Sequence, residues 1–293
     1  MKIKKAVIPA AGLGTRLLPV TKVLPKEMLP IVDKPTIQFV VEEVVNSGIK
    51  DIIIITGRNK RAIEDHFDKS YELEAELERK NNINLLESVK KISNLAKLHY
   101  VRQKESLGLG HAVYCAKSFI GNEPFAILSG DDIIKSGVPC IKQLIDVFEE
   151  YNSCILGVQK VLDEEIHKYG CVECDLVSEK IYKVKNLFEK PKSNDALSDI
   201  AILGRYVVTS EIFSYLEITK PDSNGEIQLT DALKKMLEKH DVYAYNFVGK
   251  RYDIGDKMGY LSAIVEHALS REDLKDDFKK YLNSLTYGAH ALH

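Results

Sequence analysis

Residues 51–56 read Asp-Ile-Ile-Ile-Ile-Thr, a continuous apolar run that is typical of a strand buried on both faces of a parallel sheet. Before it, Thr36–Ser47 carries apolar residues at the spacing of one helix face, and Gly48 follows as a helix stop. Ile3–Pro9 and Pro124–Ser129 are further strand-like runs. Because strand, helix and strand in this order form a right-handed crossover, we predict an α/β fold with an open mixed, mostly parallel sheet flanked by helices.

The rest of the chain adds helices and shorter strands to this sheet. Arg58–Leu98 is charged and favours helix, so we expect residues 58–98 to form a helical insertion at the sheet edge, without strand character. Met258–Leu285 predicts a C-terminal amphipathic helical segment, residues 258–285. Since no repeat or Pro/Ser-rich linker divides the chain, residues 1–293 are predicted to form a single domain. The strand-like runs between these helices are Ile155–Val161, Cys171–Cys174, Ile181–Glu189 and Ile200–Val208.

Length and composition restrict the class of protein. The chain has 293 residues, with 41 Lys and Arg against 43 Asp and Glu, a formal net charge of -2. Because that balance creates no positive field for a polyanion, we expect no nucleic acid and no membrane as a partner. No apolar run approaches the ~18 residues of a membrane span. The apolar stretch after the basic start ends at Pro9, which argues against a signal peptide.

The five cysteines predict a cytoplasmic protein with reduced thiols, because their number is odd and they are scattered along the chain. Cys171 and Cys174 have the spacing of half a zinc site. A strand would point these two thiols to opposite faces, and no second pair completes the ligand set. We therefore expect no metal at the cysteines.

A glycine-containing turn follows the first strand, in the sequence Ile8-Pro-Ala-Ala-Gly-Leu-Gly-Thr-Arg16. Backbone N–H groups in such a turn are open to an anion, since no side chains cover them. A dinucleotide fingerprint would need a third glycine at Leu17, and a phosphate-binding P-loop would need Gly-Lys before Ser or Thr; neither is present. From the glycines alone, an ordinary strand-to-helix turn is the alternative.

The loop after this turn favours a polyphosphate ligand. It carries the cations Arg16, Lys22 and Lys26, and three prolines between positions 19 and 30 stiffen its backbone. A stiff loop loses less entropy when it holds cations in position. Cations beside a glycine turn suit a polyphosphate, whose charge must be neutralised during transfer. The alternative is that these are solvated surface side chains.

With further motifs, these residues resemble the sugar-phosphate nucleotidylyltransferase family, and within it the bacterial UTP–glucose-1-phosphate uridylyltransferases. The resemblance spans nearly the whole chain in order, and it implies a Rossmann-like fold of the nucleotide-diphospho-sugar transferase type. The motifs are Ala10-Ala-Gly-Leu-Gly-Thr-Arg-Leu-Leu-Pro19, Pro25-Lys-Glu-Met-Leu-Pro30, Gln103 with Gly108-Leu-Gly-His-Ala112, Gly130-Asp-Asp132, Tyr169-Gly170, Phe188-Glu-Lys-Pro191, Gly225-Glu-Ile-Gln-Leu-Thr-Asp231 and Tyr252-Asp-Ile-Gly255.

The resemblance implies a nucleotide site built from the glycine turn and a second glycine segment. In that family the turn holds base and ribose through backbone contacts, and the glutamine at position 103 matches the residue that reads the uracil edge. A carboxamide suits this task because it offers both donors and acceptors. The nucleotide-binding residues implied are Ala10, Ala11, Gly12, Glu27, Gln103, Gly108 and Asp131.

Two carboxylates are candidates for a Mg²⁺ site. Asp131 follows a buried strand, at the carboxyl end where open α/β sheets bind ligands, and Mg²⁺ on triphosphate oxygens would be its partner. By resemblance, Asp253 matches the second metal-facing carboxylate of the family. Asp132 competes for the ligand role, but strand alternation is expected to send it to the other face.

The sugar phosphate has its own implied residues. Lys190 matches the residue that binds the sugar phosphate, Glu189 the one that accepts hydrogen bonds from sugar hydroxyls, and Gly170 a close backbone contact. Pro191 ends the strand and fixes the lysine near its end.

The activity implied is the joining of UTP and glucose 1-phosphate into UDP-glucose, with release of pyrophosphate. The sugar phosphate is mostly dianionic at pH 7, so it needs no base. Arg16 and Lys26 would stabilise the leaving pyrophosphate and the α-phosphate, and Lys190 the incoming phosphate. The alternatives are a thymidylyltransferase that uses dTTP and a non-catalytic regulatory protein that binds nucleotide sugars. The family further implies a homo-oligomer, either a dimer or a tetramer.

Overall fold

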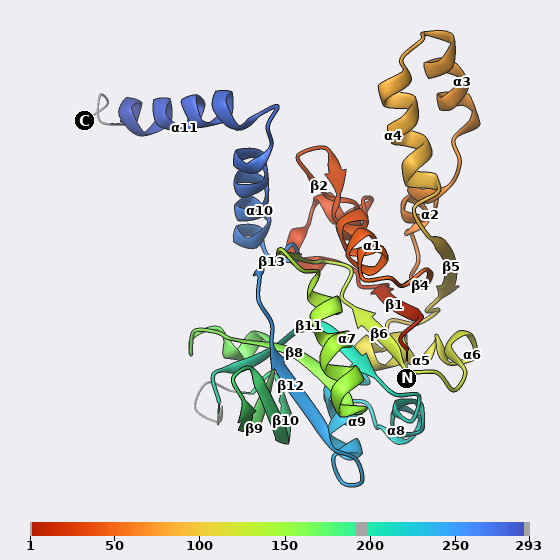
Figure 1. Cartoon of the computed structure of the whole chain (residues 1–293), viewed down its shortest axis with the longest axis vertical. Coiled ribbons are helices and arrows are strands. Elements are labelled where there is room, and N and C mark those ends of the chain that lie inside the picture. The colour runs from red at the N-terminus through yellow and green to blue at the C-terminus, as the bar shows by residue number, and fades with distance from the viewer. Residues whose placement is uncertain (1, 192–197, 290–293) are drawn as a thin grey trace.

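A nine-stranded sheet forms the centre of the computed structural model, which describes residues 2–191 and 198–289. Helices lie on both of its faces (Figure 1). Within the described residues the spatial order is β5 (Lys97–Arg102), β4 (Asp51–Thr56), β1 (Lys5–Ala10), β6 (Phe125–Leu128), β11 (Ile200–Val208), β8 (Cys154–Lys160), β12 (Val242–Asn246), β10 (Ile181–Glu189) and β9 (Gly170–Ser178).

Parallel pairing is confined to two parts of this sheet. β5, β4, β1 and β6 run parallel, and β12 runs parallel with β8. β11 is antiparallel to both β6 and β8, and β9 and β10 form an antiparallel hairpin. The predicted open mixed sheet is confirmed. It is mostly parallel only in its N-terminal half, because β11 returns in the opposite direction between β6 and β8.

The isoleucines of β4 explain why both faces are covered. Ile52 and Ile54 belong to one apolar cluster, Ile53 and Ile55 to the other, and all four are buried. A strand that points apolar side chains both ways needs a helical layer on each side. The helices of the first cluster are α1 (Thr36–Asn46), α2 (Arg61–Phe67) and α7 (Cys140–Tyr151), and those of the second are α5 (Gly108–Tyr114), α6 (Lys117–Ile120), α8 (Ile212–Ile218) and α9 (Leu229–Met236).

Two predicted helical segments differ from the structure. Residues 58–98 contain α2, α3 (Tyr71–Arg79) and α4 (Ile83–Ser93), but their last two residues begin the edge strand β5. The side chains of β5 are only half-buried, so its pattern is weaker than that of β4. The segment 258–285 is two helices, α10 (Lys257–Ser270) and α11 (Lys275–Ala289), because Arg271 adopts an extended conformation. A single domain over the chain stays a prediction.

Cys171 and Cys174 lie on a strand, as predicted. Cys171 belongs to the first apolar cluster and Cys174 packs against the second, so their thiols lie on opposite faces of β9. All five cysteines are free thiols. Separately, the helices described here lack the combination of length and apolar content that is needed to cross a membrane.

The order in which successive strands are added to the sheet reverses between the parallel neighbours β1 and β6; in open α/β sheets, ligands bind at the carboxyl ends of the strands at such a switch point. A short antiparallel ribbon extends this edge and sets Asp253 opposite Asp132, although the two residues are far apart in sequence. The ribbon is β7 (Asp132–Lys135) with β13 (Lys250–Asp253), and the remaining short elements are β2 (Pro30–Ile31), β3 (Lys34–Pro35) and the 3₁₀ turns Thr15–Leu17, Val20–Lys22, Lys26–Met28 and Ile166–Lys168.

Candidate active site

The glycine turn at the end of β1 brings two of the predicted cations to the crevice. Lys26 is largely buried, and its Nζ lies 2.5 Å from Oδ2 of Asp131. A Cβ on Gly12 would lie 3.6 Å from the same Nζ, so the glycine turn and the lysine are in contact. The Arg16 side chain is 58% exposed and reaches Oδ2 of Asp253 at 3.5 Å. Lys22 is exposed on the far part of the loop and lies outside the clefts described below.

A small cleft of about 210 Å³ lies above the turn and contains most of the predicted nucleotide residues. The buried Gln103 donates from Nε2 to the carbonyl of Gly108 at 3.1 Å and lies 2.9 Å from Nδ1 of His111. Gly108 has φ +88°, and a Cβ there would lie 2.9 Å from the carbonyl oxygen of Ile227. This position therefore requires glycine on both counts. The predicted residues that line this cleft are Ala11, Gly12, Glu27, Gln103, Gly108 and Asp131.

Ala10 is the exception among the predicted nucleotide residues. It is the last residue of β1, and its side chain is 1% exposed, inside the first apolar cluster. Its neighbours Pro9 and Ala11 line the cleft instead.

Glu27 forms a buried ion pair with a lysine that sequence reasoning missed. Nζ of Lys60 lies 2.6 Å from Oε2 of Glu27, and both side chains are buried. Oε1 of Glu27 is buried and has no hydrogen-bond partner among the described residues. Burial raises the pKa of Glu27 above its usual value, and the Lys60 ammonium opposes the shift.

A larger cleft of about 580 Å³ continues from the first and shares Lys26 and Asp131 with it. At its far end the hydroxyl of Thr230 donates to Oε2 of Glu189 at 2.7 Å, while Nζ of Lys190 lies 3.4 Å from Oε1. A Cβ on Gly170 would lie 3.2 Å from the same carboxylate, so a larger residue would crowd this end. The predicted residues that line this cleft are Arg16, Lys26, Asp131, Gly170, Glu189, Lys190 and Asp253.

Asp131 and Asp253 face a common point beside Gly255. A Cβ on that glycine would lie 2.6 Å from Nη2 of Arg16, 2.9 Å from Oδ2 of Asp131 and 3.0 Å from Oδ1 of Asp253. The backbone N–H of Gly255 donates to Oδ1 of Asp253 at 2.9 Å. Burial opposes ionisation of Asp131, but the Lys26 ammonium outweighs it and lowers the pKa of this carboxyl below its usual value.

The expectation for Asp132 is wrong. It lines the same cleft as Asp131 instead of facing away, because Asp131 lies in a turn between β6 and β7, where strand alternation does not apply. Its Oδ1 accepts hydrogen bonds from Arg251, at 2.7 Å from Nε. Burial raises the pKa of Asp132 to about 6, against the opposing charge of Arg251.

Three residues of the site have no local signal strong enough to predict them: Lys60, Thr230 and Arg251. Thr230 stands in the quoted motif Gly225–Asp231, and Arg251 directly precedes Tyr252 of another motif. The sequence motifs therefore point to the neighbourhood of both residues but do not predict which side chains they contact. Lys60 belongs to a charged segment in which most lysines are exposed.

Comparison with known proteins decides the family. A family profile described as "Nucleotidyl transferase" matches residues 5–269. This chain belongs to the nucleotidyl transferase family. The resemblance predicted from the sequence motifs is thereby confirmed.

Two relatives of this transferase share one name. It is 57% identical over 285 residues to a UTP--glucose-1-phosphate uridylyltransferase of Bacillus subtilis (strain 168), and the match covers 97% of both chains. It is 54% identical over 284 residues to a protein of the same name from Staphylococcus epidermidis (strain ATCC 12228 / FDA PCI 1200), covering 97% of this chain and 99% of that one.

Solved structures agree with the fold of this transferase. A UDP-glucose pyrophosphorylase complexed with UDP-glucose matches with a TM-score of 0.85 and 44% identity, over 92% of this chain and 100% of that chain. A UTP-bound UGPase from Acinetobacter baumannii matches with a TM-score of 0.90 and 38% identity, over 97% and 99%. The predicted nucleotide-diphospho-sugar transferase fold is confirmed.

Proposed function

We propose that this transferase makes UDP-glucose and pyrophosphate from UTP and glucose 1-phosphate. The observation that carries the proposal is the pair of adjoining clefts that meet at Lys26 and Asp131. A nucleotide in the small cleft and a sugar phosphate at the Glu189–Lys190 end would present their phosphates to each other across this junction. The names of the relatives, at 54% to 57% identity over nearly the full chain, support the same substrates.

The small cleft suits a pyrimidine nucleotide. Its volume is about 210 Å³, and Ala11 and Gly12 of the glycine turn are among the residues that line it. We assign the uracil edge to Gln103 and Gly108, and the ribose side to the turn with Glu27. Oε1 of Glu27, which has no hydrogen-bond partner among the described residues, is an acceptor that a hydroxyl donor would satisfy.

The far end of the larger cleft suits a sugar phosphate. Thr230 occupies Oε2 of Glu189, and the other oxygen, Oε1, lies 3.4 Å from Nζ of Lys190; we assign a sugar hydroxyl to Oε1 as a donor beside that ammonium. Lys190 is held there by its backbone: its φ is +43°, and its N–H donates to the carbonyl of Tyr169 at 3.1 Å. We assign the phosphate of glucose 1-phosphate to this ammonium and the close approach of the sugar to Gly170.

Asp131 and Asp253 fit a Mg²⁺ ion. Both are hard oxygen donors, and both carboxylates lie within 3.0 Å of one point beside Gly255, from which the exposed Arg16 guanidinium, now 2.6 Å away, would have to withdraw. Two carboxylates suit Mg²⁺, because this ion commonly takes one or two protein carboxylates and completes its shell with phosphates and water. Bound there, Mg²⁺ would neutralise triphosphate charge.

The protein's own residues position and stabilise the reacting phosphates. Lys190 holds the sugar phosphate, whose oxygen attacks the α-phosphorus of UTP in line; the new P–O bond forms as the bond to pyrophosphate breaks. Lys26 stabilises the charge that builds on the α-phosphate. Arg16 is exposed and pairs with Asp253 at 3.5 Å, a long ion pair, so we assign it to the leaving pyrophosphate. No side chain has to remove a proton, because the attacking phosphate is already ionised.

Two alternatives are tested by one assay, pyrophosphate release with UTP and dTTP against a panel of sugar phosphates. A thymidylyltransferase would turn over dTTP faster than UTP, and a non-catalytic binding protein would release no pyrophosphate with any pair. We expect turnover with UTP and glucose 1-phosphate, and its loss when EDTA removes the divalent metal. Turnover that is indifferent to EDTA would remove Mg²⁺ from the proposal.

We further propose a homo-oligomer formed through the C-terminal helices. Figure 1 shows α11 extending away from the sheet, and apolar side chains of both α10 and α11 are exposed. The exposed apolar side chains of α10 and α11 are Met258, Leu261, Leu269, Tyr281 and Leu285. Light scattering after gel filtration should give a dimer or tetramer, and Tyr281→Glu should shift it to monomer. A monomeric parent protein would end this proposal.

The cytoplasm is the compartment we propose for this reaction. The five free thiols support it, because an oxidising compartment favours paired cysteines. Cell fractionation followed by activity measurement tests this assignment.

A further inference from the structure

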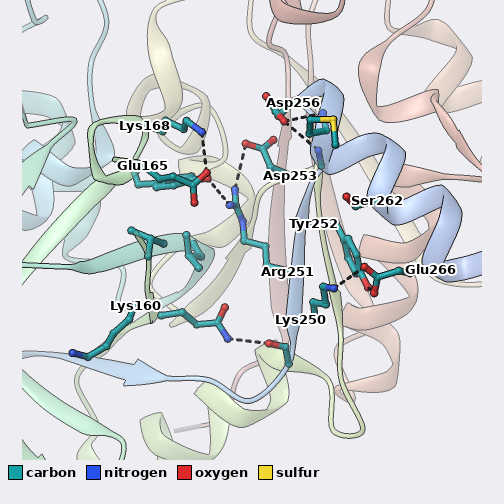
Figure 2. A pocket seen from close by; sticks show the side chains of 17 residues that line it. Lys160, Glu165, Lys168, Lys250, Arg251, Tyr252, Asp253, Asp256, Ser262 and Glu266 are labelled. Atoms are coloured by element: carbon teal, nitrogen blue, oxygen red, sulfur yellow. Dashed lines mark hydrogen bonds and ion pairs between the residues drawn. The ribbon is translucent and has the colours of Figure 1, made fainter. Parts of the chain in front are cut away.

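Arg251 lies between the larger cleft and a second hollow. Besides facing the substrate cleft, it lines a cavity of about 500 Å³ whose walls come from β13, α10, the end of β8 and residues 165–169. Figure 2 shows this cavity, with the Arg251 side chain directed toward Asp253 and away from Lys250. Its side chain is only 13% exposed. A buried guanidinium at the wall of a substrate cleft needs partners, and those partners indicate its role.

The guanidinium of Arg251 contacts three residues of the cleft wall at once. Nε and Nη2 lie 2.7 and 2.6 Å from Oδ1 of Asp132. Nη1 donates to the hydroxyl of Tyr169 at 3.1 Å, and the guanidinium carbon lies 4.9 Å from the centre of that ring. Nη2 also lies 3.7 Å from Oδ2 of Asp253. One side chain therefore joins the carboxylate proposed for the metal to the residue that precedes Gly170.

The strand geometry explains how one residue can do this. Arg251 and Asp253 are two residues apart on β13, so they point to the same face, while Tyr252 between them is buried in a separate apolar cluster. Asp132 lies opposite Asp253 in the paired strand β7. Asp132 is itself confined, because a Cβ on Gly204 would lie within 3 Å of both Asp132 and Ser129. Close packing against Gly204 therefore fixes the Asp132 carboxylate, to which the Arg251 guanidinium binds.

The second cavity does not have the character of an anion site of its own. Its lysines are paired with neighbouring carboxylates, Lys168 with Glu165 at 3.0 Å and Lys250 with Glu266 at 2.6 Å (Figure 2). The cavity matters here because it gives a small molecule space to reach the side chain of Arg251.

We propose that Arg251 is a positioning residue of the transfer reaction. Its guanidinium keeps Asp253 and Tyr169 at a fixed distance from each other. The carboxylate proposed for the metal and the backbone at Gly170, which would contact the sugar, are then correctly placed when the two phosphates meet. This inference rests on the proposed function. A lysine could not replace it, because a single ammonium cannot contact a carboxylate, a phenol and a second carboxylate in one plane.

The first test compares Arg251→Ala and Arg251→Lys with Lys250→Ala, which removes a cation from the adjacent, outward-facing position. In both Arg251 variants kcat should fall about 100-fold and the KM for glucose 1-phosphate should rise, while UTP affinity measured without metal stays unchanged. Binding of Mn²⁺ followed by electron paramagnetic resonance should weaken about tenfold. Lys250→Ala should match the parent. Parent-like kcat and Mn²⁺ binding in Arg251→Lys would overturn the proposal.

The second test uses chemical rescue of Arg251→Ala. Guanidinium chloride at low millimolar concentration should enter through the cavity and restore activity about tenfold, whereas urea, which has the same shape without the charge, should not. Equal effects of both compounds, or none from either, would overturn the proposal. If Arg251→Ala does not fold, the lysine variant decides alone. A parent protein that makes no UDP-glucose would instead contradict the proposed function, so the two failures are distinguishable.

Discussion

Nζ of Lys26 lies 2.5 Å from Oδ2 of Asp131, and both residues line the small cleft and the large one. Although burial opposes the charge of Lys26, the Asp131 carboxylate outweighs it and raises the pKa of the lysine above its usual value. A permanent cation at the junction of two phosphate sites is what phosphoryl chemistry requires, because it offsets the repulsion between two anions. This pair is therefore the centre of the proposed reaction.

Lys26→Ala should lower kcat/KM about 100-fold or more, because it removes a buried cation from the α-phosphate. Lys22→Ala is the matched control, since it removes a lysine from the same loop at an exposed position outside the clefts. Steady-state kinetics of both variants measure the difference. Equal, small effects of the two substitutions would exclude Lys26 from the phosphate site.

Asp131→Asn should raise the Mg²⁺ concentration needed for half-maximal rate and lower kcat, because the amide is a weaker ligand for a hard cation and also leaves Lys26 unpaired. Circular dichroism checks that the fold is intact. A Mg²⁺ titration that superimposes on that of the parent would remove Asp131 from the metal site.

Lys190→Ala should raise the KM for glucose 1-phosphate and lower kcat while it spares UTP binding, because the ammonium stands at the far end of the larger cleft. Thr230→Val should have a smaller effect on the same KM, about fivefold, since it removes one hydrogen bond to Glu189 worth about 1 kcal/mol. Calorimetry with UTP alone provides the control. Loss of UTP affinity in Lys190→Ala would contradict the assignment.

Gly108→Ala should weaken UTP binding, because the new Cβ meets the carbonyl of Ile227 at 2.9 Å in a backbone with φ +88°. Gly121→Ala is the control, since Gly121 also has a positive φ, +67°, but its Cβ would meet no atom within 4 Å. Gly121→Ala should cost about 1 kcal/mol of stability through its positive φ alone, Gly108→Ala should cost more because of the added clash, and only Gly108→Ala should change UTP affinity. The idea fails if calorimetry gives the same UTP affinity for both.

Arg205→Met should destabilise the protein by about 3–5 kcal/mol, because it leaves Glu43 buried without its partner. Arg205 is fully buried, binds Glu43 through two nitrogens and donates to the backbone carbonyl of Asp132 at 2.9 Å. The double variant Glu43→Leu with Arg205→Met should recover much of the loss. Urea unfolding measures both, and additive losses would contradict the pairing argument.

The sequence predicts the parallel half of the sheet well because its signals are local. The isoleucines of β4 and the glycine stop after α1 act within a few residues, and Gly48 indeed has φ +87°. β5 escaped prediction because an edge strand is only half-buried and does not show a continuous apolar run. The break at Arg271 escaped because the amphipathic pattern continues on both sides of it.

The site residues that belong to a sequence motif could be predicted, whereas the residues whose role depends on a contact with a distant part of the chain could not. Lys26, Asp131 and Lys190 stand in recognisable segments, and the structure brings all three to one cleft. The roles of Arg251 and Lys60 depend on partners more than 30 residues away, Asp132 and Glu27, which no local pattern encodes. Asp132 was misplaced for a related reason, since a turn interrupted the alternation that was applied to it.

The central claim is that two phosphates meet at the Lys26–Asp131 pair, from separate anchors. Crystals grown with UDP-glucose and Mn²⁺ test it directly through the anomalous signal of the metal. The account predicts a peak about 2.1–2.3 Å from carboxylate oxygens of Asp131 and Asp253, with the diphosphate between Lys26 and Lys190. A diphosphate bound away from Lys26, or a metal that contacts neither carboxylate, would contradict it.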